Sequence, residues 1–79
     1  MANRIHVKYF GSLVDVTGVS EEVLAEASDL EAVLALLQQR YPALAQRSYT
    51  LAIDKKIVQG NALLQDGQTL ALMPPFSGG

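Results

Sequence analysis

The 79-residue sequence contains no cysteine, and its single histidine is His6. Without cysteine the chain cannot form a disulfide or a cysteine zinc site, and it has no thiol to act as a nucleophile or to carry a persulfide. One histidine cannot supply the ligand cluster that a structural zinc site usually needs, so we expect no metal. Any chemistry of this chain must therefore use groups other than thiols or a zinc cluster of cysteine and histidine.

Long hydrophobic runs are also missing. No apolar segment approaches the roughly 18 residues that a membrane span requires, and the start of the chain lacks the basic and apolar segments of a secretion signal. With 49% hydrophobic and 18% charged residues, the composition is typical of one small folded domain. We therefore expect a cytoplasmic protein that does not act at a membrane.

Basic residues are few: the sequence has six Lys and Arg and eight Asp and Glu, which gives a net charge of −2. This balance argues against nucleic acid as a ligand, because phosphate binding needs a basic face. The segment 9–39 has no Lys or Arg and holds six of the acids. We interpret it as a solvated acidic face, with a docking patch for a basic partner as the alternative. The six acids are Asp15, Glu21, Glu22, Glu26, Asp29 and Glu31.

The first segment, residues 3–10, alternates apolar and polar side chains and predicts a half-buried strand. Ile5, Val7 and Tyr9 form its apolar side. Phe10 breaks the alternation because it falls on the polar side, beside Lys8. Residues 11–18 predict a connection with one helical turn, and residues 19–27 predict a second strand that forms a hairpin with the first.

The clearest element is a helix that begins near Leu30, because apolar residues repeat from there at the spacing of one helical face. Ser28 and Glu31 fit a capping box at its start. Pro42 predicts that it ends near residues 39–41. The repeating residues are Leu30, Val33, Leu34, Leu37 and Tyr41.

Further strands are predicted at residues 50–54, 57–58 and 69–73, with polar turns at 54–56, 60–61 and 66–67. This order predicts an α+β roll of the ubiquitin type, the β-grasp. In this fold the first and last strands pair in the middle of a mixed sheet of four or five strands, and one main helix crosses one face. A split βαβ arrangement is the alternative. We place the β-grasp domain at residues 1–73 and a flexible, extended tail at residues 74–79.

The last six residues differ in kind from the rest: Pro74, Pro75, Phe76, Ser77, Gly78 and Gly79. The prolines end strand pairing and the glycines carry no side chain. Such a tail reaches up to ~20 Å, at about 3.3–3.6 Å per residue, which is enough to enter a cleft of another protein. The ionised carboxylate of Gly79 is inert, but an acyl adenylate made with ATP would open it to a sulfur or amine nucleophile. A frayed terminus without a role is the alternative.

On this order of elements, and on the double proline Pro74-Pro75 followed by two residues and Gly78-Gly79, the chain resembles the ubiquitin-like ThiS/MoaD family of sulfur carriers, and within it the small subunits of molybdopterin synthase. The resemblance implies that an E1-like enzyme uses ATP to adenylate Gly79, which then carries sulfur as a thiocarboxylate. It implies a carrier that is no enzyme on its own and binds no cofactor. The carrier would donate sulfur to cyclic pyranopterin monophosphate in the large subunit of a heterotetrameric synthase, which forms the dithiolene of molybdopterin.

The resemblance also implies a docking surface on the sheet at Phe10, Ile57 and Met73, with the tail residues 74–78 entering a channel of the partner. Bulky Phe76 is expected to fill a groove on the large subunit. Phe10 covering the sheet end within its own chain is the alternative. A carrier of the thiamine pathway, which usually lacks the double proline, and a ubiquitin-like modifier of lysines would use the same terminus. A purely non-covalent binding module is the third alternative.

Overall fold

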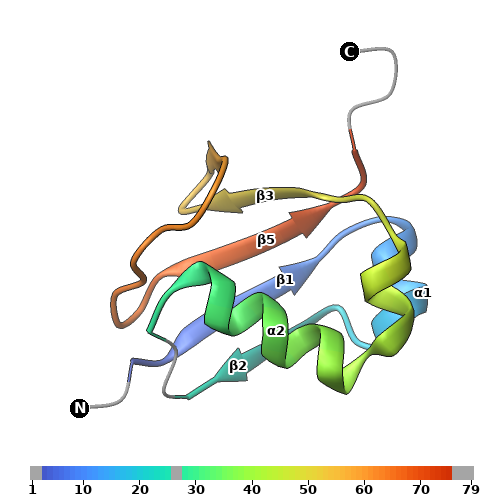
Figure 1. Cartoon of the computed structure of the whole chain (residues 1–79), viewed down its shortest axis with the longest axis horizontal. Helices are drawn as coiled ribbons and strands as arrows, with labels where there is room; N and C mark the ends of the chain where they lie inside the picture. Colours follow the sequence, from blue (N-terminus) through green and yellow to red (C-terminus); the bar gives the residue numbers. More distant parts are fainter. Residues whose placement is uncertain (1–2, 26–27, 76–79) are drawn as a thin grey trace.

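The computed structural model describes residues 3–25 and 28–75 of the chain (Figure 1). The predicted strands and the main helix are present, while the first helix is longer than the single turn predicted and a 3-10 helix after Pro42 was not predicted. None of the helices in the described ranges has the length and apolar character needed to span a membrane. In chain order the elements are β1 (Ile5–Tyr9), α1 (Ser12–Thr17), β2 (Glu21–Leu24), α2 (Leu30–Arg40), η1 (Pro42–Gln46), β3 (Thr50–Ile53), β4 (Lys56–Val58) and β5 (Thr69–Met73).

The five strands form one mixed sheet in the order β2-β1-β5-β3-β4. The first and last strands, β1 and β5, are parallel neighbours at its centre, and the other pairs are antiparallel. Helix α2 crosses one face of the sheet (Figure 1). This arrangement confirms the predicted β-grasp and is not the split βαβ alternative.

The core lies between the sheet and α2. The inward residues of β1 and β5 are buried, as the alternation predicted, and so are Leu30, Val33 and Leu37 of α2, while Leu34 is half-buried. Each such side chain stabilises the fold by roughly 1.5–3 kcal/mol. The fully or nearly fully buried members are Ile5, Val7, Tyr9, Leu13, Leu24, Leu30, Val33, Leu37, Leu44, Ile53, Leu64, Leu70 and Leu72.

Helix α2 begins differently from the prediction, because its N-cap is Asp29 and not Ser28. The Asp29 carboxylate accepts a hydrogen bond from the Ala32 backbone N–H at 2.9 Å and another from the Asn61 side-chain amide at 3.1 Å. The backbone N–H of Glu31 donates to the Asn61 side-chain oxygen at 2.9 Å. The capping-box prediction is wrong because Asn61, from the loop after β4, meets the start of the helix and takes part in the cap.

The cap makes the stability of the fold depend on pH. The hydrogen bond from Ala32, and then that from Asn61, hold the pKa of Asp29 below its ordinary value of 3.8. A lowered pKa means that the ionised carboxylate stabilises the folded state, fully above pH 3.8 and less as the pH falls through the lowered pKa. Asp29→Asn keeps an acceptor but cannot titrate. We therefore expect its melting temperature to fall less than that of the wild type between about pH 5 and about pH 2.

Thermal unfolding followed by circular dichroism measures this difference. Glu31→Gln is the matched control, since Glu31 is an exposed acid in the same turn of α2. Melting temperatures of Asp29→Asn and wild type that fall in parallel would contradict the assignment of the cap.

Strand β2 begins at Glu21, two residues later than predicted, and its next residue turns inward. The Glu22 carboxylate accepts hydrogen bonds from the phenols of Tyr9 at 2.6 Å and Tyr41 at 2.7 Å, and it pairs with Arg40 at 2.5 Å. Burial, and next the bond to Glu22, raise the pKa of the Tyr9 phenol. The interpretation of the acidic segment as a solvated face is therefore wrong for Glu22, which ties β1, β2 and the end of α2 together.

Candidate functional site

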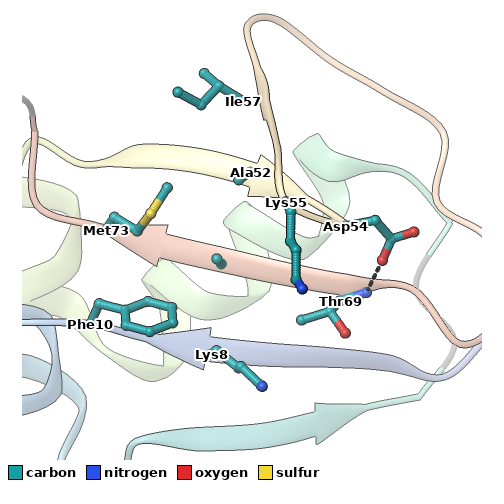
Figure 2. A pocket seen from close by; sticks show the side chains of 9 residues that line it. Lys8, Phe10, Ala52, Asp54, Lys55, Ile57, Thr69 and Met73 are labelled. Carbon is teal, nitrogen blue, oxygen red and sulfur yellow. Dashed lines mark hydrogen bonds between the residues drawn. The ribbon is translucent and has the colours of Figure 1, made fainter.

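The face of the sheet opposite α2 carries an open hollow of about 590 Å³ (Figure 2). All three residues that the resemblance placed in a docking surface, Phe10, Ile57 and Met73, line it. Phe10 directly follows β1, Ile57 lies in β4 and Met73 ends β5, so the sheet topology brings them to one place. The full lining is Lys8, Phe10, Ala52, Asp54, Lys55, Ile57, Thr69, Ala71 and Met73.

Two alanines form the floor of the hollow. Ala71 of β5 lies opposite Ala52 of β3, and the same row continues to Lys8 on one side and Ile57 on the other. An alanine side chain is a single carbon, so the centre of the row stays low while longer side chains rise around it. The hollow is thus a consequence of small residues on central strands and larger ones at its border.

Phe10 forms one wall and is available to a partner. Phe10 is 45% exposed, and Ile57 is 55% exposed. The backbone of Phe10 is held by its neighbours, since its N–H donates to the Leu72 carbonyl at 3.0 Å and its carbonyl accepts from the Leu13 N–H at 3.1 Å. The rest of the residue is covered by its own chain, so this exposure fits a docking role and also the alternative in which Phe10 covers the sheet end. Exposed apolar side chains that lie close together are typical of a binding surface.

The other end of the hollow is charged. The polar turn predicted at residues 54–56 is present but one residue shorter, since Lys56 already belongs to β4. Asp54 (φ 48°) and Lys55 (φ 72°) have left-handed backbone, as in the tight turns of hairpins. The Asp54 carboxylate accepts from the Thr69 backbone N–H at 3.0 Å. The turn carries Lys55 over the sheet, toward the end of the hollow where Lys8 lies (Figure 2).

The segment after β5 leaves the sheet beside this hollow, and Gly11 determines how closely it passes. Gly11 has φ 58° and ψ −135°, and a β-carbon there would lie 2.7 Å from Cγ of Pro74. The Pro74 ring therefore packs directly on the Gly11 backbone, next to Phe10. Pro74 and Pro75 are exposed. The remaining tail residues of the prediction, Phe76, Ser77, Gly78 and Gly79, lie outside the described residues.

Gly11→Ala is expected to displace Pro74, because the added carbon has no room and the backbone angles disfavour any side chain. Gly18→Ala is the matched control, since Gly18 also has a positive φ of 80° but no atom within 4 Å of an added β-carbon. We expect a loss in the free energy of unfolding of about 1 kcal/mol for Gly18→Ala and about 2–3 kcal/mol for Gly11→Ala.

Urea unfolding measures the two free energies. Amide NMR shifts of Phe10 and Met73 report the position of the strand exit, and we expect them to move only in Gly11→Ala. Equal losses of stability with unchanged shifts in both variants would show that Pro74 does not depend on Gly11.

The mixed sheet, the single crossing helix and the apolar hollow at the exit of β5 define a ubiquitin-like protein of the β-grasp class. Residues 7–79 match the model of the ThiS family, and the chain belongs to this family.

Two curated relatives match nearly the whole chain. The molybdopterin synthase sulfur carrier subunit of Chlamydomonas reinhardtii is 33% identical over 82 residues, which cover 96% of this chain and 99% of that protein. The human protein of the same name is 30% identical over 83 residues, which cover 96% of this chain and 94% of the human protein.

Two solved structures share the fold. Small archaeal modifier protein 1 of Methanosarcina acetivorans has a TM-score of 0.83 and 25% identity, covering 100% of this chain and 99% of that one. A chain from the complex of subunits 1 and 2 of the molybdopterin-converting factor of Helicobacter pylori has a TM-score of 0.72 and 24% identity, covering 96% and 99%.

Proposed function

We propose that this chain is the sulfur carrier subunit of molybdopterin synthase. The observation that carries the proposal is the 33% identity to a protein of that name over nearly the full length of both chains. The sequence adds the double proline followed by Gly78-Gly79, and the described structure adds an apolar hollow where the tail begins.

In this proposal the reactive group is the main-chain carboxyl of Gly79. An E1-like enzyme joins it to AMP from ATP and releases pyrophosphate, and a sulfur nucleophile then displaces AMP. The carbon–oxygen bond to the phosphate breaks, a carbon–sulfur bond forms, and the carboxylate becomes a thiocarboxylate. The charged carrier gives this sulfur to cyclic pyranopterin monophosphate, and two rounds build the dithiolene. The carrier contributes no catalytic side chain and no bound cofactor, and it works in the cytoplasm, where ATP is available.

The proposed partner in the second step is the large subunit of the synthase, in a heterotetramer of two small and two large subunits. The H. pylori structure, a complex of subunits 1 and 2 of the corresponding factor, supports a partner of this kind. We assign the docking to Phe10, Ile57 and Met73, whose apolar side chains line one hollow. The tail from Pro74 to Gly78 leads Gly79 into the partner, with Phe76 in a groove on the way.

The test is mass spectrometry of the chain after incubation with its activating enzyme, ATP and a sulfide source. Replacement of one oxygen by sulfur at the C-terminal carboxyl adds ~16 Da, and we expect this gain only when ATP is present. No gain of mass under any condition, with full cofactor synthesis by a chain that lacks Gly79, would overturn the proposal.

A second function is favoured by the likeness to small archaeal modifier protein 1, which extends over the whole chain at 25% identity. A modifier would use Gly79 to form isopeptide bonds with lysines of other proteins. Persistent conjugates after the same incubation would support it, whereas conversion of cyclic pyranopterin monophosphate supports the carrier. Sulfur delivered instead to a thiazole precursor would favour the thiamine pathway.

A further inference from the structure

The hollow on the open face of the sheet has two ends of different chemistry. Phe10, Ile57 and Met73 make one end apolar, whereas the ammonium groups of Lys8 and Lys55 lie toward the other end (Figure 2). A purely apolar contact would need no charge there. The two cations therefore indicate what kind of surface the hollow accepts.

No anion of the chain neutralises these lysines within the described residues, where the one ion pair joins Arg40 and Glu22. Glu21 is the register partner of Lys8 across β1 and β2, yet the two do not form an ion pair. The Asp54 carboxylate is occupied by the backbone N–H of Thr69 at 3.0 Å and by the amide of Gln68 at 3.4 Å. Within residues 3–25 and 28–75, neither ammonium group is therefore held in an ion pair, and both can meet charges of a partner.

These charges disfavour a second copy of the chain as the occupant. A two-fold dimer through the hollow would bring Lys8 and Lys55 of both copies to one interface with only the two Asp54 carboxylates, so positive charge would be in excess there and would repel. A partner with carboxylates at that place would be attracted and oriented.

We propose that Lys8 and Lys55 select the partner and set its orientation, by pairing with carboxylates that flank an apolar protrusion on the large subunit. The inference rests on the proposed function, since it takes that subunit as the occupant. The apolar end supplies contact area, and the two lysines fix which way the partner lies and speed its approach. Neither lysine touches the reacting carboxyl in this proposal, so both are specificity residues and not catalytic ones.

The chain contains a matched control for each lysine. Lys56 adjoins Lys55 but lies opposite Ile53, whose side chain is in the core, so it does not line the hollow. Arg47 follows η1 and is exposed away from the hollow. The variants K8E/K55E and R47E/K56E therefore change the net charge equally, and only the first changes the hollow. K8Q/K55Q removes the charges without adding new ones, in case a carboxylate at position 8 would repel Glu21.

Binding is measured by surface plasmon resonance against the purified large subunit encoded in the same genome, at about 50 mM and about 500 mM salt. At low salt we expect K8E/K55E to weaken affinity about tenfold, mostly through slower association, and R47E/K56E to change it less than about twofold. The difference should shrink at high salt, because the Debye length falls to a few ångströms. K8Q/K55Q should lie between the wild type and K8E/K55E.

The outcomes separate the inference from the proposed function. A wild-type chain that binds, with both double variants weakened alike or with a difference that does not depend on salt, overturns the role of the lysines and leaves the carrier function standing. A wild-type chain that does not bind this subunit overturns both. Self-association of the wild type that K8Q/K55Q strengthens would show that a second copy fills the hollow, and would also overturn the inference.

Discussion

Addition of one alanine after Gly79 abolishes sulfur uptake and leaves the fold unchanged, if the terminal carboxyl is the reactive group. The extra residue moves the carboxylate by about 3.3–3.6 Å and places a β-carbon at the tip of the tail. Misplacement of a reacting group by about 1 Å can already cost about 100-fold in rate. We therefore expect thiocarboxylate formation to fall by more than about 100-fold, as measured by intact mass, with an unaltered urea unfolding curve.

The matched control inserts the same alanine between Met1 and Ala2, which adds equal mass at the opposite end of the chain. This variant should take up sulfur like the wild type. An extended chain that intact mass shows to be unprocessed, and that still supports cofactor synthesis, would refute the thiocarboxylate mechanism.

Phe10→Asp is expected to weaken binding to the large subunit by about 30-fold or more, which corresponds to about 2 kcal/mol, as for a buried aromatic at the centre of an interface. Phe10 is 45% exposed in the free chain and lines the hollow with Met73. A carboxylate in its place would lose the apolar contact and bury a charge. Stability should change little, because the hydrogen bonds of Phe10 with Leu72 and Leu13 use only the backbone.

Isothermal titration calorimetry gives the affinity, and thermal unfolding of the free chain gives the stability. Leu63→Asp is the control, since Leu63 is 83% exposed and does not line the hollow. Unchanged affinity of Phe10→Asp together with a large loss of stability would mean that the ring serves its own chain. Ala71→Leu tests independently whether the large subunit binds in the hollow, because the larger side chain fills the floor of the hollow without adding charge.

Much of the fold follows from local periodicity. The alternation of Ile5, Val7 and Tyr9 predicted the inner face of β1, and the helical repeat from Leu30 predicted the buried face of α2. The cap of α2 did not follow, because it depends on Asn61, thirty-two positions from Asp29 and without a local signal. The 3-10 helix after Pro42 was missed since Leu44 is its only buried residue and gives no period.

The site was partly predictable for the same reason. Phe10 stood out because it was apolar on the polar side of a strand, and the structure places it with Met73 as the pairing of β1 and β5 required. Lys55 was predicted only as part of a polar turn, since its position over the sheet arises from two left-handed residues in succession.

The sequence gives weaker signals for the floor of the hollow and for the path of the chain after β5. Ala71, between Leu70 and Leu72, and Ala52, between Leu51 and Ile53, are the local signs of a hollow at the sheet centre. The contact of Gly11 with Pro74 joins residues far apart in the sequence and needed the fold to be seen. The roles of residues 76–79 stay predictions.

The central position of β5 has a consequence for how the protein is made. Among the strands it is the last to leave the ribosome, yet it lies between β1 and β3 and supplies Leu70 and Leu72 to the core. Until β5 is available, β1 and β3 lack their shared neighbour, and closing the sheet requires contacts between distant parts of the chain. A nascent chain interrupted before β5 would stay unfolded and open to proteases. The domain can therefore complete its folding only after β5 has left the ribosome, and the segment that starts at Pro74 leaves directly after β5.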